Sequence, residues 1–207
     1  MEASGPAPPG PLVVRGRLSH VARAVIEPYS ERWPHDFARI ARSLRAVLGE
    51  RALRIDHIGS TAVPGLPAKD TIDLQVTVAD LTDANPLGGA GFREFGPVSD
   101  HRPPWAFVGD ADWAKRLFNE PPGGRPTNIH VRVQGRANQR YALLFRDYLR
   151  THPHSAAAYA DLKRRLAAEI RDRGRYADVK DPACDLIMAS AEEWAAATVW
   201  EPGPSDA

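Results

Sequence analysis

The sequence predicts an α/β domain of the α+β kind, with helices packed on a small mixed β-sheet and a helical C-terminal third. Two observations carry this prediction. Apolar residues recur at helical spacing before residue 50 and again after residue 136. Between these regions lie short segments in which apolar and polar residues alternate, as they do in half-buried strands.

The individual elements follow from the same patterns. Pro34 is a good first helical residue and Gly49 a plausible stop, so the first helix is expected at 34–48. Two further helices are expected at 137–150 and 153–170, and Asp181 with Pro182 is expected to open a last helix that runs to residue 194. Alternation predicts strands at 72–78 and 129–133, and further short strands are expected at 53–58, 92–95 and 115–118.

The length suits one domain with short tails. The chain has 207 residues, enough for a full hydrophobic core in a single domain at 18–200. Residues 1–17 begin with a stretch rich in Pro, Gly and Ala, which predicts a disordered tail. Residues 201–207 have a similar composition and are expected to be flexible.

Composition also narrows the partners. The formal net charge of +1 argues against nucleic acid and the membrane surface as partners. The single cysteine, Cys184, excludes an intramolecular disulfide and suits a reducing compartment. No apolar run reaches the roughly 18 residues of a membrane helix, and the N-terminus lacks a signal-peptide pattern. We therefore expect a cytoplasmic protein that binds a small molecule or nucleotide, and the oligomeric state stays open.

One loop and the strand after it point to phosphate chemistry. Gly59 and Ser60 follow a predicted strand and precede a Pro-rich turn, so backbone N–H groups and the Ser hydroxyl can cradle a phosphate. In the strand at 72–78, period-2 geometry puts Asp73, Gln75 and Thr77 on one face. A carboxylate beside a phosphate-binding loop is what metal-assisted phosphoryl or nucleotidyl transfer needs.

These segments resemble the signature of the GrpB family. The resemblance is carried by residues 57–69 (HIGSTAVPGLPAK) and 72–76 (IDLQV). Other segments match more loosely: 26–29, 33–34, 129–131, 145–150, 152–153, Tyr159, 162–163, Tyr176 and Lys180. The family resemblance implies a nucleotidyltransferase-like fold, in a protein that occurs alone or fused to dephospho-CoA kinase.

The resemblance also implies a site pattern, from which this chain departs. The fold's pattern is a Gly-Ser turn, a strand with two acidic residues one apart, and a third acidic residue on a neighbouring strand. Here Asp73 is present, but Gln75 and His130 take the other two places, and Asn128 stands where the family usually has another His. Gln and His make a poorer magnesium site, whereas a softer divalent metal or an acid–base role would suit His130.

The candidate residues follow from the loop, the strand and the resemblance. Asp73 and His130 are the catalytic candidates and the candidate ligands of a divalent cation, Mg²⁺ or Mn²⁺. The candidates for binding phosphate or ligand are Gly59, Ser60, Thr61, Lys69, Gln75, Lys115, Arg116 and Arg146.

Each candidate also has a structural interpretation. Gly59 and Ser60 are also typical of an ordinary tight turn, and Asp73 and His130 of structural strand residues. Arg146 favours an ion pair with another element over a phosphate contact. For the whole chain three functions stay open. They are a nucleotidyltransferase-type enzyme, a non-catalytic ligand-binding or accessory module, and a biosynthetic enzyme that uses the same cleft for another reaction.

Overall fold

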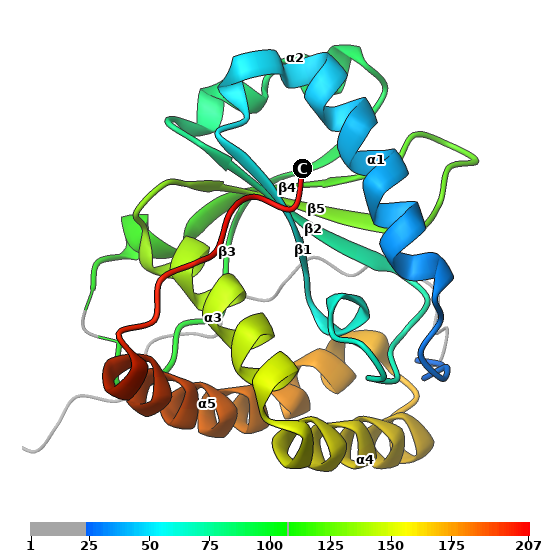
Figure 1. The fold of residues 1–207 in the computed structure, drawn as a ribbon. Helices are drawn as coiled ribbons and strands as arrows, with labels where there is room; N and C mark the ends of the chain where they lie inside the picture. The colour runs from blue at the N-terminus through cyan, green and yellow to red at the C-terminus, as the bar shows by residue number, and fades with distance from the viewer. Residues whose placement is uncertain (1–23, 107) are drawn as a thin grey trace, which may run out of the picture.

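Five strands form one mixed sheet at the centre of the molecule (Figure 1). The computed structural model describes residues 24–106 and 108–207, so the predicted tail at 1–17 and the first residues of the predicted domain lie outside the described part. The strands are β1 (Arg54–Ile58), β2 (Ile72–Val78), β3 (Arg93–Ser99), β4 (Ala114–Asn119) and β5 (Thr127–Val133). Their order is β1-β2-β5-β4-β3, with β2 and β5 parallel and the other neighbours antiparallel. The predicted mixed sheet is confirmed.

One face of the sheet is apolar and packs under α1 (Arg32–Leu48) and the short α2 (Pro86–Gly89). Trp33, Phe37, Leu44 and Leu48 of α1 are buried at helical spacing, as the sequence predicts. They meet the alternate residues of β2 that point the same way, Ile72, Leu74, Val76 and Val78, together with Phe118, Ile129 and Val131. This cluster is the main core.

The other face of the sheet is polar and is covered by α3 (Ala137–Thr151), which packs on α4 (Pro153–Glu169) and α5 (Arg173–Thr198) (Figure 1). The helical C-terminal third is therefore confirmed. The last helix, however, begins at Arg173 and not at Pro182. Asp172 supplies the N-terminal cap by accepting a hydrogen bond from the Arg175 N–H, and Pro182 lies inside the helix.

The end of the chain lies against the free edge of the sheet. The C-terminal segment, red in Figure 1, returns from α5 to β1. The Ile55 N–H donates to Ser205 Oγ, the His57 N–H donates to a carboxylate oxygen of Asp206, and the Ala207 N–H donates to the Ile55 carbonyl. The last three residues of the predicted tail at 201–207 thus form hydrogen bonds along the outer edge of β1.

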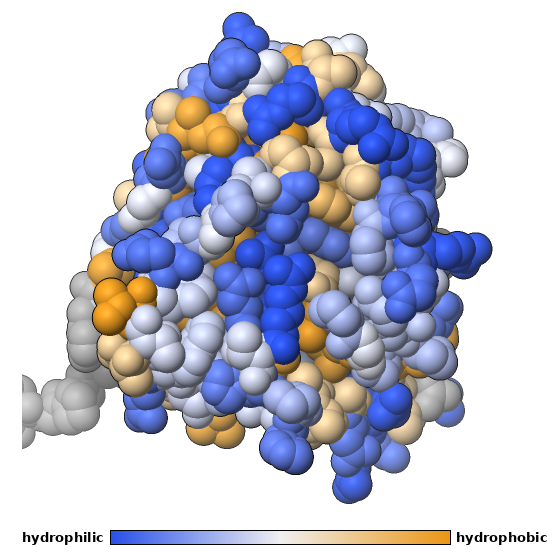
Figure 2. Space-filling model, in the orientation of Figure 1, coloured by the Kyte–Doolittle hydropathy of each residue, from blue (hydrophilic) through white to orange (hydrophobic). Residues whose placement is uncertain are grey.

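One face of the molecule gives little sign of a large apolar contact. On the face shown in Figure 2, hydrophobic residues lie in small separate groups between hydrophilic ones. Within the described part of the chain, no helix combines the length and the apolar character that crossing a membrane requires.

Candidate functional site

A cavity of about 350 Å³ lies on the polar side of the sheet, between β2, β5, the loop after β1, and helices α3 to α5. It includes Gly59, Ser60, Thr61, Lys69, Asp73 and His130 in its wall. The structure thus brings together six candidates from three separate stretches of sequence. The Gly-Ser turn, the strand carrying Asp73 and the neighbouring strand carrying His130 have the arrangement that the nucleotidyltransferase-like fold implies.

Gly59 allows the loop to approach β2 closely. Its φ is +69°, and a Cβ added there would lie 2.5 Å from Oδ2 of Asp73. Only glycine fits this contact without a shift of the loop or the carboxylate. Ser60 follows at the start of a short 3₁₀ helix, and its hydroxyl accepts a hydrogen bond from Lys163 Nζ at 2.9 Å.

Lysines 69, 163 and 180 all line the cavity, and we call them the lysine cluster. Lys163, only 3% exposed, also donates to the Pro67 carbonyl. Burial lowers the pKa of Lys163 from 10.5 to about 7, with further lowering by the charges of Lys180 and Lys69. An anion bound here would offset the repulsion among the three lysines, because its negative charge attracts all of them.

An aromatic row forms another part of the wall. Its members, Trp113, Tyr141, Phe145 and Tyr159, contact one another in sequence, with ring centroids 6.1, 6.1 and 5.7 Å apart. Tyr159 also touches the lysine cluster, because Lys163 Nζ lies 4.7 Å from its ring centroid. The cavity therefore joins an aromatic wall, in which only the Tyr141 and Phe145 rings are nearly parallel, to a group of cations.

Asp73 and His130 lie on neighbouring strands in the same wall. Oδ1 of Asp73 accepts a hydrogen bond of 2.7 Å from Asn128 Nδ2 and lies 3.9 Å from Nε2 of His130. Burial by itself would raise the pKa of Asp73, but His130, Asn128 and Lys69 outweigh it and lower that pKa. Asp73 is therefore a charged acceptor on the cavity wall, with 30% of its side chain exposed.

A charge network lies next to His130. Asp100 is bound by Lys115, by Arg132 Nε at 2.8 Å and by Asn138 Nδ2 at 3.2 Å. Burial would raise the pKa of Asp100, but Arg132 and Lys115 drive it far below its ordinary value. Burial first, and the charges of Lys115 and Arg132 next, lower the pKa of His130 to about 4.

The family model for the GrpB protein matches residues 23–190. The chain belongs to the GrpB family. The crystal structure of GrpB from Enterococcus faecalis has a TM-score of 0.66 and 28% identity to it, covering 82% of this chain and 99% of that one. The assignment thus agrees with a solved structure over nearly the whole of that GrpB chain.

Two curated relatives of this GrpB protein differ in length. A "Dephospho-CoA kinase" of Mycolicibacterium paratuberculosis is 40% identical over 204 residues, covering 88% of this chain and 50% of the relative. A "UPF0157 protein" of Halalkalibacterium halodurans is 36% identical over 174 residues, covering 83% of this chain and 84% of the relative. The chain thus spans about half the length of the relatives named as kinases.

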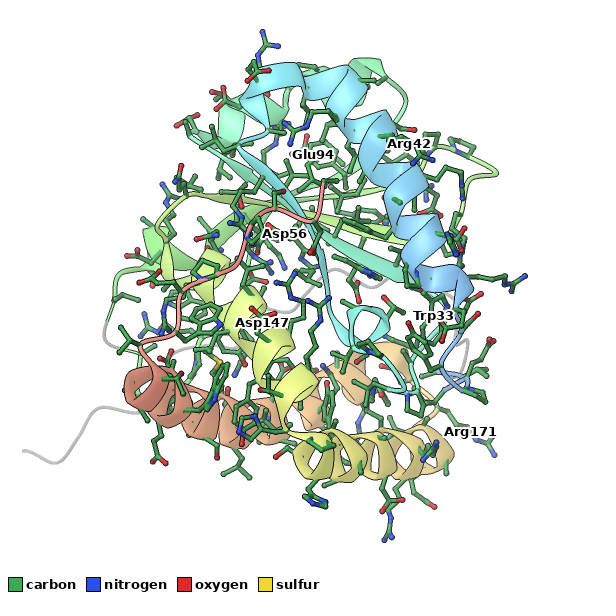
Figure 3. The ribbon with its side chains drawn as sticks, viewed as in Figure 1. Trp33, Arg42, Asp56, Glu94, Asp147 and Arg171 are labelled. Carbon is green, nitrogen blue, oxygen red and sulfur yellow. The ribbon has the colours of Figure 1, made fainter. Side chains whose placement is uncertain are left out.

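Two predicted ligand-binding residues of this GrpB protein, both arginines, point away from the cavity. Arg116 is adjacent to Lys115 on a strand, so it faces the opposite side of the sheet, where it binds Glu94 and Asn85. Figure 3 shows Glu94 near α1, away from helices α3 to α5. Arg146 is buried against β1, where it donates to the His57 carbonyl and to Asp206. Arg146 thus forms the kind of ion pair that its structural interpretation expects.

Gln75 and Thr61 have their polar groups paired with other residues of the protein. Gln75 is fully buried, donates to the Gln139 carbonyl and accepts a 2.6 Å hydrogen bond from Arg132. Thr61 lines the cavity, but its hydroxyl is paired with Nε2 of His57 at 3.0 Å. Both therefore hold other residues in place. Lys115 acts similarly, because its ammonium contacts Asp100 and His130.

The residues at Asp73 do not fit a magnesium or manganese centre. Hard divalent cations take several oxygen ligands, with carboxylates foremost. Asp73 offers one carboxylate, and Asn128 turns its N–H₂ group toward it. Within the described part of the chain, no three His, Cys, Asp or Glu residues are grouped as metal ligands would be. The nearby cations Lys115 and Arg132 add repulsion.

Sequence reasoning did not assign roles to several cavity residues. Lys163, Tyr159 and Lys180 stood only in the family resemblance, because nothing local shows that α4 and α5 fold back to the loop. Arg132 could have been predicted to lie near the site, since alternation puts it on the same strand face as His130. Cys184 also lies next to a cation of the cavity, because Lys180 Nζ is 3.5 Å from its sulfur at the helical i, i+4 spacing.

Proposed function

We propose that this GrpB protein binds a nucleotide, or another phosphorylated small molecule that carries a ring, in the cavity between the sheet and helices α3 to α5. The observation that carries the proposal is the union of the Gly59-Ser60 loop, the lysine cluster and the aromatic row in one cavity. A phosphate needs donors and positive charge, and a planar ring needs a flat apolar surface. The cavity volume of about 350 Å³ lies at the lower end of typical small-molecule sites.

The phosphate belongs at the junction of the loop and the lysine cluster. Lys163 joins the two, since its ammonium donates to Ser60 Oγ. A phosphate bound at Lys163 would add a charge-assisted hydrogen bond to those that this ammonium makes with Ser60 and Pro67. The ring then lies along the aromatic row that begins at Tyr159, next to Lys163.

The candidate ligands include CoA-type nucleotides. The name of the M. paratuberculosis relative, dephospho-CoA kinase, refers to such a molecule, and about half of that relative matches this chain. In the enzymatic form of the proposal, a nucleotidyltransferase-type reaction, the lysine cluster stabilises charge on the phosphates and Asp73 orients the attacking group. In the alternative, the domain is a binding or accessory module. The single carboxylate of the Asp73 site favours this alternative.

A thermal-shift screen tests the proposal. It compares ATP, GTP, CTP, UTP, CoA and dephospho-CoA, each with Mg²⁺, with Mn²⁺ and with EDTA. We expect stabilisation by at least one phosphorylated ligand, and we expect it to survive EDTA because the donor set does not fit a metal. The Lys163→Met variant should lose the stabilisation, and Arg116→Met, a cation on the opposite face, should keep it.

Two results would count against the proposal. If no compound in the screen stabilises the protein, the proposal that it binds a phosphorylated ligand is wrong. Stabilisation that requires the metal and disappears in Asp73→Asn would restore a metal-dependent transferase. Analysis of the bound nucleotide after incubation separates the remaining two forms, since only an enzyme converts it.

A further inference from the structure

Two cations converge on one nitrogen of His130. Lys115 Nζ lies 2.9 Å from Nδ1, and Arg132 Nη2 lies 3.4 Å from the same atom. An ammonium and a guanidinium carry only donors and have no lone pair to offer. Asp100 binds both cations and thereby keeps them at this position. Nδ1 of His130 must therefore be the hydrogen-bond acceptor in both contacts.

The acceptor role of Nδ1 fixes the proton on the other nitrogen. A neutral imidazole has one N–H and one lone pair, so a lone pair at Nδ1 leaves the proton on Nε2. An imidazolium would direct an N–H at two cations, which is unfavourable at these distances. The charged groups around the ring are Lys115 from β4, Arg132 from β5, Asp73 from β2 and Asp100, which follows β3.

The Nε2–H group faces Asp73 across the cavity wall. The 3.9 Å between Nε2 and Oδ1 is too long for a direct hydrogen bond. The pair therefore presents one donor and one charged acceptor side by side. The chemical group that matches both is a hydroxyl, which donates to the carboxylate and accepts from the N–H.

We propose that His130 is a neutral hydrogen-bond donor, held in its Nε2–H form by Lys115 and Arg132, and that with Asp73 it binds a hydroxyl group of the ligand. The assignment of the hydroxyl rests on the proposed function. The tautomer does not, because it follows from contacts within the protein. A proton on Nε2 also removes the lone pair that a metal or a general base would use.

Long-range ¹H–¹⁵N NMR of the histidine rings tests the tautomer without any ligand. The His130→Gln variant assigns the signal by its loss. We expect the Nε2–H pattern for His130 at neutral pH, unchanged by Mn²⁺ alone. An Nδ1–H pattern, an imidazolium pattern or selective broadening by Mn²⁺ would overturn the inference.

The Lys115→Met variant tests the cause. Methionine fills the same space without a donor, so part of the population should change to the Nδ1–H form. A ring that stays wholly Nε2–H would show that Lys115 does not hold the tautomer. The wild-type spectrum decides the tautomer itself, even where this variant folds poorly.

The hydroxyl is tested with ribose 5-phosphate, and inorganic phosphate serves as the probe that lacks a sugar. We expect ribose 5-phosphate to shift both the His130 Nε2 signal and the Lys163 side-chain signal, and inorganic phosphate to shift Lys163 alone. A response of Lys163 without His130 would overturn the hydroxyl contact and leave the proposed function intact. No response of either residue to either probe would count against both.

Discussion

Lys163→Met is the change that tests the phosphate site most directly. Methionine keeps most of the length and removes the charge at a buried position whose ammonium donates to Ser60 Oγ. A hydrogen bond between charged groups contributes about 1.5–3 kcal/mol, which corresponds to a roughly 10- to 150-fold loss of affinity for the phosphorylated ligand. This full loss applies at about pH 6, where Lys163 is protonated.

The same lysine predicts a pH dependence. Burial, together with Lys180, Arg164 and Lys69, lowers the pKa of Lys163 to about 7, whereas Cys184 opposes the shift. A bound anion favours the protonated form, so binding above pH 7 requires proton uptake, and the affinity should fall by up to about tenfold per pH unit. The second ionisation of a phosphate, near pH 6, acts in the opposite direction. The wild-type advantage over Lys163→Met should therefore shrink as the pH rises.

Isothermal titration calorimetry from pH 6 to 9 measures both effects. Two buffers with different ionisation enthalpies report the protons taken up on binding. Arg116→Met is the matched control, because it removes a cation from the opposite face of the sheet. Equal affinity of wild type and Lys163→Met at pH 6 would refute the role of Lys163. A wild-type affinity that is independent of pH would refute the coupled protonation.

Three further changes test the scaffold. Gly59→Ala should cost about 1–3 kcal/mol in urea unfolding, since φ is +69° and the new Cβ would meet Asp73; unchanged stability would contradict the close approach. Burial lowers the pKa of His57 from 6.5 to about 4. Between these two pH values the unfolded chain binds a proton that the folded protein excludes, so the free energy of unfolding falls as the pH drops. His57→Gln should remove about 2 kcal/mol of that fall between pH 7 and 5, as seen in urea unfolding at both pH values. Gln75→Leu should lower the free energy of unfolding by about 1–3 kcal/mol because Arg132 loses its acceptor, and a neutral result would mean that Gln75 is dispensable.

Alternation explains how much of the site the sequence could predict. It placed Asp73 on the polar face of β2 and His130 on the polar face of its neighbour, and the structure has both on the cavity wall. The same rule separates Lys115 from Arg116, which adjacency in sequence had grouped. A period-2 pattern is local, so it survives without any knowledge of the tertiary fold.

What the sequence could not predict comes from chain segments that meet only after folding. Lys163 is about 100 positions beyond Ser60, and its contact depends on how α4 packs. Helix boundaries are also decided by tertiary context. The Asp181-Pro182 pair has the pattern of a helix start, yet Asp172 caps the helix nine residues earlier and Pro182 lies within it. Packing of α5 on α3 and α4 offsets the lost hydrogen bond.

Gln75 stands where the pattern of the nucleotidyltransferase-like fold has its second acidic residue. The charge network around His130 gives a physical reason for this difference. Arg132 donates to Gln75 Oε1 at 2.6 Å and to both oxygens of Asp100, and it also approaches His130. A carboxylate at position 75 would compete with Asp100 for the guanidinium and weaken its hold on the imidazole. A neutral amide accepts the same hydrogen bond and leaves the positive charge in place. Gln75 therefore belongs to a network in which Lys115, Arg132 and Asp100 set the charge around His130.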